Sequence, residues 1–275
     1  MLYVKSLYKK ITEKAGRNST GRITCRHRGG RITKKYSLPN FRRRLFNVLG
    51  QIIRIKKESV RTAFIALVFY KKYGIYEYII APSNVKVGSF VFATKDEISE
   101  KAFVWVKYQK YLKNLGNSFF LKYFKIGSML FNVEKFPGSG GVLMRAAGCF
   151  AKVIQKISLG IFKIYVAIRV KSKKICYLKG ECSGVLGQAS NFRHNKIFLK
   201  KAGVSRNKGF RPSVRGVAMN PVDHPHGGGE GKTSGGRISV SAWGKLTKGK
   251  KTLARYKKLR LKKYAKKLRF GKSLK

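Results

Sequence analysis

The residues that could do chemistry gather in one short loop. Asp223, His224 and His226 place an acid and two imidazoles close together, a set that could serve acid–base catalysis or bind a metal. Pro221 and Pro225 exclude a regular helix through this loop, and six glycines follow within ten residues. Such a loop provides no substrate pocket by itself. We therefore interpret both histidines as hydrogen-bonding groups that meet a bound partner.

A phosphate-binding loop is the second chemistry to consider. Gly231, Lys232 and Thr233 fit the end of the pattern G-x-x-x-x-G-K-[ST], but its first glycine falls on His226. The preceding residues do not form a strand pattern, and the following ones do not begin a helix. A nucleotide-dependent RNA enzyme using Gly227–Thr233 is therefore kept only as the alternative hypothesis.

Metal and cofactor sites find little support. The four cysteines contain no C-x-x-C pair, which favours free thiols; they are Cys25, Cys149, Cys176 and Cys182. A zinc site from Cys176, Cys182 and His194 is the one candidate, and its spacing is unusual. We expect no metal and no cofactor of the chain's own; Mg ions held by a bound RNA are compatible with this.

The charge of the chain is extreme. Its 275 residues include 63 Lys and Arg against 10 Asp and Glu, a formal net charge of +53. Residues 14–57 and 231–275 contain no acid, so the two ends are interpreted as polycationic arms. The native partner should supply negative charge, and nucleic acid fits better than an anionic membrane. A general nucleic-acid-compacting protein is a further alternative. The longest apolar runs are too short to predict a membrane span.

The middle of the chain has a β pattern in two series. The first lies within residues 45–115, and its runs are Gln51–Ile55, Ala63–Tyr70, Tyr76–Ala81, Ser89–Ala93 and Ala102–Tyr108. Short strands at this spacing indicate a small barrel or sandwich. Lysines alternate with aromatic residues here, which favours a five-stranded oligonucleotide-binding barrel, although most of the aromatics are expected to pack inside.

The second series lies within residues 116–192. Its runs are Ile126–Val133, Val142–Ala146, Phe150–Ile154, Ile161–Val170 and Ile175–Leu178. Glycines between them are hairpin and bulge signals, which predicts a second barrel. A helical turn is expected over Asn195–Ala202, and Thr252–Phe270 has partial helical spacing. We thus expect a mainly β protein in which a basic extension, 1–44, precedes the barrels. An extended glycine-, proline- and lysine-rich region, 193–275, follows them.

One stretch also resembles a known family. Gly216–Gly231 reads G-V-A-M-N-P-V-D-H-P-H-G-G-G-E-G and is similar to the signature of the universal large-subunit ribosomal protein two family. Further segments resemble the same family over residues 16–252; they are Gly16–Gly30, Tyr78–Pro82, Asn132–Glu134, Pro137–Gly141, Arg145–Gly148, Arg211–Gly216 and Thr247–Thr252. Residues 95–113 and 155–182 depart from the family's pattern.

The resemblance implies a fold and a function. It implies an oligonucleotide-binding barrel, then an SH3-like barrel, with basic extensions threaded through large-subunit rRNA. It implies a structural role rather than an enzyme, with neighbouring ribosomal proteins and the small subunit as further partners. His224 matches the family histidine that supports the peptidyl-transferase region, and Asp223 matches its neighbour.

The residues expected to bind rRNA are cations of the arms and positions in or near the signature. They are Arg17, Arg22, Arg26, His27, Arg28, Arg42, Arg43, Arg44, Arg211, Arg215, Met219, Asn220, His224, His226, Gly227, Gly228, Gly229, Lys232, Trp243, Lys248, Lys250 and Lys251. The richness in Lys, Ile, Phe and Tyr suggests an AT-rich genome. We therefore predict a mitochondrial ribosome, with a plastid or bacterial ribosome as the alternative.

Overall fold

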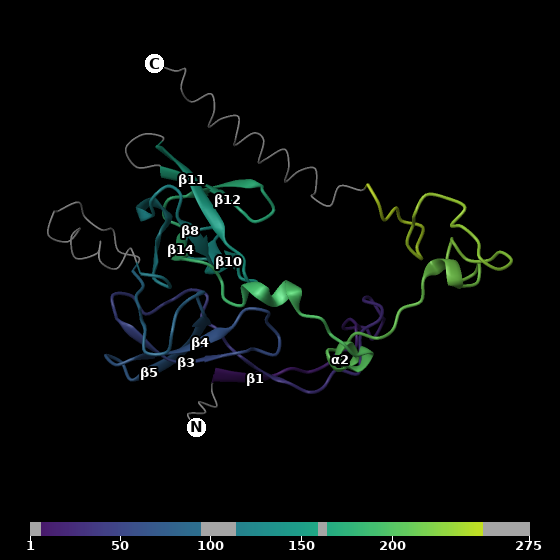
Figure 1. Cartoon of the computed structure of the whole chain (residues 1–275), viewed down its shortest axis with the longest axis horizontal. Coiled ribbons are helices and arrows are strands. Elements are labelled where there is room, and N and C mark those ends of the chain that lie inside the picture. Colours follow the sequence, from purple (N-terminus) through teal and green to yellow (C-terminus); the bar gives the residue numbers. More distant parts are fainter. Residues whose placement is uncertain (1–6, 95–113, 159–163, 250–275) are drawn as a thin grey trace, which may run out of the picture. The chain divides into compact units, whose positions relative to one another are not determined.

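The chain divides into two compact units (Figure 1). A computed structural model describes residues 7–94, 114–158 and 164–249. Unit 1 comprises Met1–Thr12 and Thr33–Phe198, and unit 2 comprises Glu13–Ile32 and Leu199–Lys275. All of the described strands belong to unit 1, and the fold is mainly β, as predicted.

An antiparallel sheet forms the first barrel of unit 1. Its described strands, in the order β5-β4-β3-β6, are β3 (Gly50–Lys56), β4 (Ile65–Tyr70), β5 (Ile75–Ile80) and β6 (Phe90–Val91). Alternating residues such as Ile52, Val68 and Tyr70 fill the interior. Gly50 is required because a Cβ there would lie 2.4 Å from Val68 Cγ1. Four predicted strands of the oligonucleotide-binding barrel are confirmed, and the fifth, Ala102–Tyr108, lies outside the described residues.

A short strand pair covers part of this sheet. Strands β1 (Tyr8–Lys10) and β2 (Lys35–Ser37) pair with each other. The Tyr8 and Tyr78 hydroxyls lie 2.7 Å apart, and Lys56 Nζ donates to the Tyr8 hydroxyl at 2.8 Å. Burial, and then the hydrogen bond to Tyr8, raise the pKa of Tyr78 above its usual value. Part of the predicted N-terminal extension therefore consists of strands packed on the barrel.

The second barrel has a sheet of six described strands in the order β13-β12-β11-β8-β14-β7. They are β7 (Ser118–Phe120), β8 (Met129–Phe131), β11 (Ala151–Ser158), β12 (Ile164–Arg169), β13 (Ile175–Lys179) and β14 (Ser183–Leu186). Strands β9 (Val133–Glu134) and β10 (Gly141–Leu143) form a separate pair, and the 3-10 helix η2 (Leu121–Tyr123) follows β7. The arrangement agrees with the SH3-like barrel that the resemblance implies.

A buried carboxylate organises the glycine loop of this barrel. Glu134 is fully buried, and its side chain accepts the backbone N–H groups of Gly138, Gly140 and Ser183 at 3.3, 3.0 and 2.9 Å. Backbone N–H groups that meet a carboxylate are satisfied without water, so the loop between β9 and β10 is held against β14.

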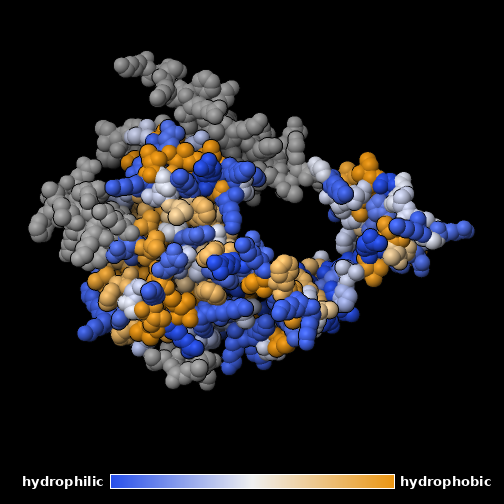
Figure 2. Space-filling model, viewed as in Figure 1, coloured by the Kyte–Doolittle hydropathy of each residue, from blue (hydrophilic) through white to orange (hydrophobic). Residues whose placement is uncertain are grey.

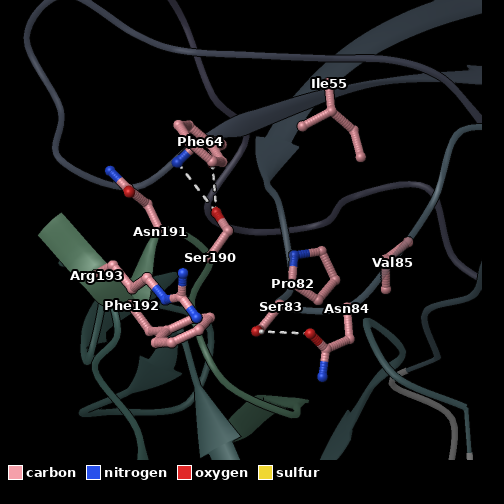
Figure 3. A pocket seen from close by; sticks show the side chains of 10 residues that line it. All are labelled: Ile55, Phe64, Pro82, Ser83, Asn84, Val85, Ser190, Asn191, Phe192 and Arg193. Atoms are coloured by element: carbon pink, nitrogen blue, oxygen red, sulfur yellow. Dashed lines mark hydrogen bonds between the residues drawn. The ribbon is translucent and has the colours of Figure 1, made fainter.

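The two barrels are joined into one body. Ile80 of the first barrel packs against Phe131 and Val185 of the second. Ser83 N–H donates to Gln188 O at 2.7 Å, and Ser190 Oγ accepts the Phe64 N–H at 3.0 Å. A hollow of about 400 Å³ lies at this junction, and Figure 3 shows the side chains around it. Its lining residues are Ile55, Phe64, Pro82–Val85 and Ser190–Arg193.

Unit 2 is built differently. The regular elements of its described part are the helix α2 (Ala202–Asn207) and the 3-10 helix η4 (Gly216–Ala218). Within its described residues only Gly29 and Gly209 are buried, and the Gly29 N–H donates to Gly209 O at 3.0 Å. No hydrophobic side chain of the described part is buried. Backbone hydrogen bonds and turns, rather than a core, therefore define this unit.

Several sequence predictions need correction. The helical turn over Asn195–Ala202 is misplaced: η3 (Phe192–Lys196) overlaps only its first two residues, and α2 begins only at its last residue, Ala202. Strands β7 and β14 were not predicted, because each is short and one contains Gly184. Residues 161–163 of the predicted run Ile161–Val170 lie outside the described residues, as does Thr252–Phe270. In the described residues no helix is long and apolar enough to cross a membrane.

Candidate nucleic-acid interface

The arginine-rich segment near the N-terminus lies against a segment far along the chain. Arg211 N–H donates to His27 O at 3.0 Å, and the Arg28 guanidinium lies 4.1 Å from the centre of the Phe210 ring. Arg206 donates to Gly29 O and fixes the turn there. The predicted residues of this segment are all exposed; they are Arg17, Arg22, Arg26, His27 and Arg28. Unit 2 thus gathers two predicted contact regions on one scaffold.

His226 holds the proline–glycine loop together. Its Nδ1 lies 2.8 Å from Gly235 O, and its Nε2 lies 3.0 Å from the backbone nitrogen of Val240. A carbonyl can only accept and a backbone N–H can only donate, so Nδ1 carries the proton and Nε2 accepts. Both ring nitrogens are therefore used inside the loop. The expectation that His226 hydrogen-bonds to RNA does not fit this geometry.

His224 presents one ring nitrogen outward from this network. Its Nδ1 accepts the His226 N–H at 3.0 Å, and the two rings stack with centroids 5.1 Å apart. The other nitrogen, Nε2, then carries the proton of the neutral ring, and no partner for it lies among the described residues. Gly216 lies against the ring: a Cβ there would come 2.4 Å from His224 atoms. Asp223 is exposed, and within the described chain its carboxylate makes no hydrogen bond to His224, so no acid–base pair forms.

The glycines of the signature meet protein atoms. A Cβ on Gly227 would lie 2.3 Å from Asn220 O, and Gly228, at φ +90°, donates its N–H to Met219 O at 3.1 Å. Thr233 Oγ1 donates to Gly228 O at 3.1 Å. The sequence predicts these glycines to bind rRNA; within the loop they already let the backbone fold on itself. No helix follows Thr233 in the described residues, so this is no phosphate-binding loop.

A turn at the end of the described chain exposes an aromatic ring. Thr247 N–H donates to Ser239 O at 3.0 Å, and Trp243, 68% exposed, lies in the turn between them. The Arg26 guanidinium lies 6.0 Å from the Trp243 ring centre. The other predicted residues of unit 2 are exposed or half-buried; they are Arg211, Arg215, Met219, Asn220, Gly229, Lys232 and Lys248. Lys250 and Lys251 lie outside the described residues.

The three consecutive arginines of unit 1 differ in their burial. Arg42 and Arg44 are exposed, but Arg43 is only 4% exposed, and its Nη2 donates to Gly116 O at 2.9 Å. This guanidinium ties the N-terminal stretch to the link between the barrels. The expectation that Arg43 contacts RNA does not fit its burial.

A pair of arginines that the sequence did not single out meets at the barrel junction. The Arg61 and Arg145 guanidinium groups lie 4.7 and 4.5 Å from the centre of the Phe41 ring. Burial, and then the neighbouring charge of Arg145, lower the pKa of Arg61. Arg145 belongs to a family-like segment, but its meeting with Arg61 depends on tertiary contacts. Two cations held this close favour a polyanion, because it relieves their repulsion.

The surface is rich in hydrophilic side chains on both units (Figure 2). A second hollow, about 370 Å³, lies in unit 2 and is formed largely by the signature; it is lined by Arg26, Val214, Ala218, Met219, Asn220 and Asp223. Its lining offers a single carboxylate, Asp223, and no cysteine, histidine or lysine. Within the described residues no three His, Cys, Asp or Glu side chains could hold a metal together, which includes the zinc candidate Cys176, Cys182 and His194.

Comparison with known proteins gives consistent matches. Residues 4–93 match the family model "Ribosomal Proteins L2, RNA binding N-terminal domain", and residues 114–244 match "Ribosomal Proteins L2, C-terminal domain". The "Large ribosomal subunit protein uL2" of Dinoroseobacter shibae is 45% identical over 249 residues, 90% of this chain and 82% of that protein. Those of a Wolbachia strain and of Legionella pneumophila are 44% and 42% identical, over 92% and 90% of this chain and 85% and 82% of their own lengths.

Proposed function

The chain belongs to the ribosomal protein L2 family, and on that premise we propose that it is a structural, rRNA-binding constituent of the large ribosomal subunit and not an enzyme. The observation that carries this proposal is the construction of unit 2. Its described residues bury no hydrophobic side chain and expose cations along an irregular backbone. A segment without a core gains little stability from its own contacts, whereas binding a polyanion supplies it.

Two observations weigh against the alternatives. A nucleotide-dependent enzyme would need a phosphate cradle, and Gly227–Thr233 is instead folded on itself by Thr233 and Met219. A compacting protein needs only charge, whereas His226 holds one defined loop conformation through two ring hydrogen bonds. A defined loop suits a partner of defined shape, such as folded rRNA.

We propose the following rRNA contacts. The exposed arginines of both arms bind phosphates, and Arg61 and Arg145 add a pair at the barrel junction. Arg43 and His226 are left out because both are used inside the protein. Trp243 offers a ring for base stacking. Neighbouring ribosomal proteins and the small subunit remain proposed partners from the family resemblance, as do Mg ions of the rRNA.

His224 is proposed to support the peptidyl-transferase region through the N–H of its Nε2. The ring is held by three contacts from two residues: the His226 N–H, the His226 ring and the Gly216 backbone. A donor oriented in this way can position an RNA group without reorganising. Loss of one such hydrogen bond costs about 0.5–3 kcal/mol, which is small beside many phosphate contacts but large for a catalytic geometry.

The test uses large subunits that carry His224→Ala, with His194→Ala in unit 1 as the matched control. We expect normal stoichiometry for both and a roughly tenfold slower peptide-bond formation for His224→Ala alone, which corresponds to about 1.4 kcal/mol. Subunit joining is measured in parallel. Normal activity at full occupancy contradicts the role of His224, and failure of the unmodified chain to enter large subunits contradicts the structural role itself.

We further propose that the protein is located in a mitochondrial ribosome. The richness in Lys, Ile, Phe and Tyr supports this, whereas the similar proteins named above are bacterial and give an organelle no support over a bacterium. Sedimentation of the tagged chain with mitochondrial, plastid or bacterial large subunits separates the three. We also keep the domain boundaries 1–44, 45–115, 116–192 and 193–275 as a proposal, which is tested by sequencing the ends of the fragments that resist limited proteolysis.

A further inference from the structure

The outer face of the first sheet carries a transverse row of residues. Strand register places Tyr76 opposite Phe69, Phe69 opposite Gln51, and Gln51 opposite Phe90. Directly opposed residues on antiparallel strands point to the same face, so this row crosses β5, β4, β3 and β6. Three inter-strand steps of roughly 4.8 Å make it roughly 14 Å long. It is an aromatic row interrupted by one amide.

These rings lie outside the barrel interior, although Tyr76 packs at the edge of a small cluster on the outer face. The interior is filled from the opposite face by residues such as Ile52 and Val68. Phe90 is 58% exposed, while Phe69 and Tyr76 are half-buried and stack on each other, with centroids 4.7 Å apart and planes at 29°. Leu7 and Tyr8 pack against the same cluster, around Leu67 and Tyr78, so they lie beside the Tyr76 end of the row. Figure 2 shows hydrophobic groups among hydrophilic ones on the lobe that carries this sheet.

A β-bulge adds a cation to the same face. The register of β3 against β4 shifts between Ile52 and Arg54, where Ile53 is the extra residue. Without it Arg54, three positions after Gln51, would point into the barrel, because side chains alternate. With it Arg54 lies opposite Leu67, on the face of the row, and is exposed.

The charges of this sheet are sorted between its faces. Glu77 is the one acid in the four strands, and it lies opposite Val68, on the other face, where it accepts from Asn40. The face with the row therefore combines one exposed and two half-buried aromatic rings, an amide and a guanidinium with no carboxylate from these strands. Aromatic rings stack on bases, Arg binds phosphate, and a carboxylate would repel the backbone.

We propose that this row, defined as Tyr76, Phe69, Gln51 and Phe90, is a stacking platform for unpaired bases of an RNA strand whose backbone meets Arg54. The proposal rests on the proposed function only in taking RNA as the ligand. It assigns to this sheet a mode of binding different from the phosphate contacts of the arms: stacking depends on the bases and is nearly independent of salt, whereas phosphate binding weakens steeply as salt rises.

The test measures binding of a single-stranded RNA octamer by the full chain. An excess of unlabelled duplex RNA occupies the electrostatic sites, and the same octamer without bases serves as the second probe. We expect Tyr76→Leu to weaken octamer binding about tenfold without changing the salt slope, and not to affect the probe without bases. Tyr76→Phe, which keeps the ring, should bind like the unmodified chain. Arg54→Gln should instead reduce the salt slope by about 0.7.

The matched control is Phe136→Leu in the second barrel. Phe136 is 63% exposed and has Lys135 5.3 Å from its ring centre, but it lies outside the row. The proposal is overturned if Phe136→Leu weakens binding as much as Tyr76→Leu, if the probe without bases loses affinity equally, or if the octamer does not bind under competition. Circular dichroism must match for all variants, and Phe90→Leu, at an exposed position, replaces any that unfolds. Incorporation into large subunits is scored separately, so the proposed function can survive this failure.

Discussion

The barrels of unit 1 and the irregular unit 2 are both rich in positive charge, but they are stabilised in opposite ways. Unit 1 buries a core, and one of its few acids, Glu134, is buried and accepts hydrogen bonds from three backbone N–H groups. Unit 2 buries only Gly29 and Gly209 within its described residues. Its aromatic groups, such as Phe210 and Trp243, remain open at the surface beside arginines.

The difference indicates which unit is stable by itself and which unit needs a bound partner to be stable. Burial of apolar side chains stabilises a fold in water by about 25 cal/mol per Å², so unit 1 can be stable alone. Unit 2 has no comparable burial in its described part, and its hydrogen bonds compete with water. We infer that bound RNA supplies what the core supplies in unit 1, and each prediction below compares the two units.

Limited trypsin digestion should give the largest contrast. In the free full-length protein we expect rapid cleavage at described unit 2 sites such as Arg211, Arg215 and Lys232. Sites on strands, such as Lys152 and Arg169, should be cut slower by several orders of magnitude, because they open only with the barrel. Added rRNA should protect the unit 2 sites alone. Early strand cleavage, mapped by mass spectrometry, would contradict autonomous barrels.

Removing one ring from each unit sharpens the comparison. Phe119→Ala empties a fully buried site in the second barrel and should lower the free energy of unfolding by about 4 kcal/mol. Phe210→Ala removes a ring that is 45% exposed and should change it by less than about 0.5 kcal/mol. Urea denaturation followed by circular dichroism gives both values. Equal losses would mean that unit 2 contributes a hidden core.

The smallest expected effect is a pH dependence confined to unit 1. Burial, and then the nearby Glu134 charge, raise the pKa of the Cys182 thiol from 9.0 to about 11. Above pH 9 the thiol of the unfolded chain loses its proton while the thiol of the folded chain keeps it. The contribution of this thiol to stability is therefore fully present below pH 9 and is lost as the pH rises to about 11. The loss is no more than about 1.4 kcal/mol per pH unit. The difference between the unmodified chain and Cys182→Ala should therefore shrink over this range. A difference that stays constant with pH would exclude the linkage.

Local pattern predicted much of unit 1. Alternation and turn residues located β3, β4 and β5 to within two residues, because each of these strands alternates or runs apolar between clear turn signals. Strands β1, β2, β7 and β14 were missed because they are short, and pairing with partners distant in sequence defines them. The helical turn failed because a six-residue helix such as α2 has too few turns for a periodic signal.

The candidate site was likewise predicted only in part from the sequence. Residue types alone identified the polyanion partner, because net charge and acid-free segments do not depend on folding. They could not show that Arg43 is buried or that Arg61 and Arg145 share Phe41, since these follow from how the barrels meet.

Chemistry that depends on residue type was therefore determined by the sequence itself: a basic RNA-binding chain, two β series and a proline–glycine loop without helix. The tertiary structure alone decided which members of a residue class are available to a partner. His224 and His226 are two positions apart and chemically identical, yet one has both ring nitrogens satisfied within the loop and the other keeps an N–H without a described partner. The physical reason is that a hydrogen bond depends on distance and direction between groups far apart in the chain, such as His226 and Val240, and no local pattern encodes that geometry.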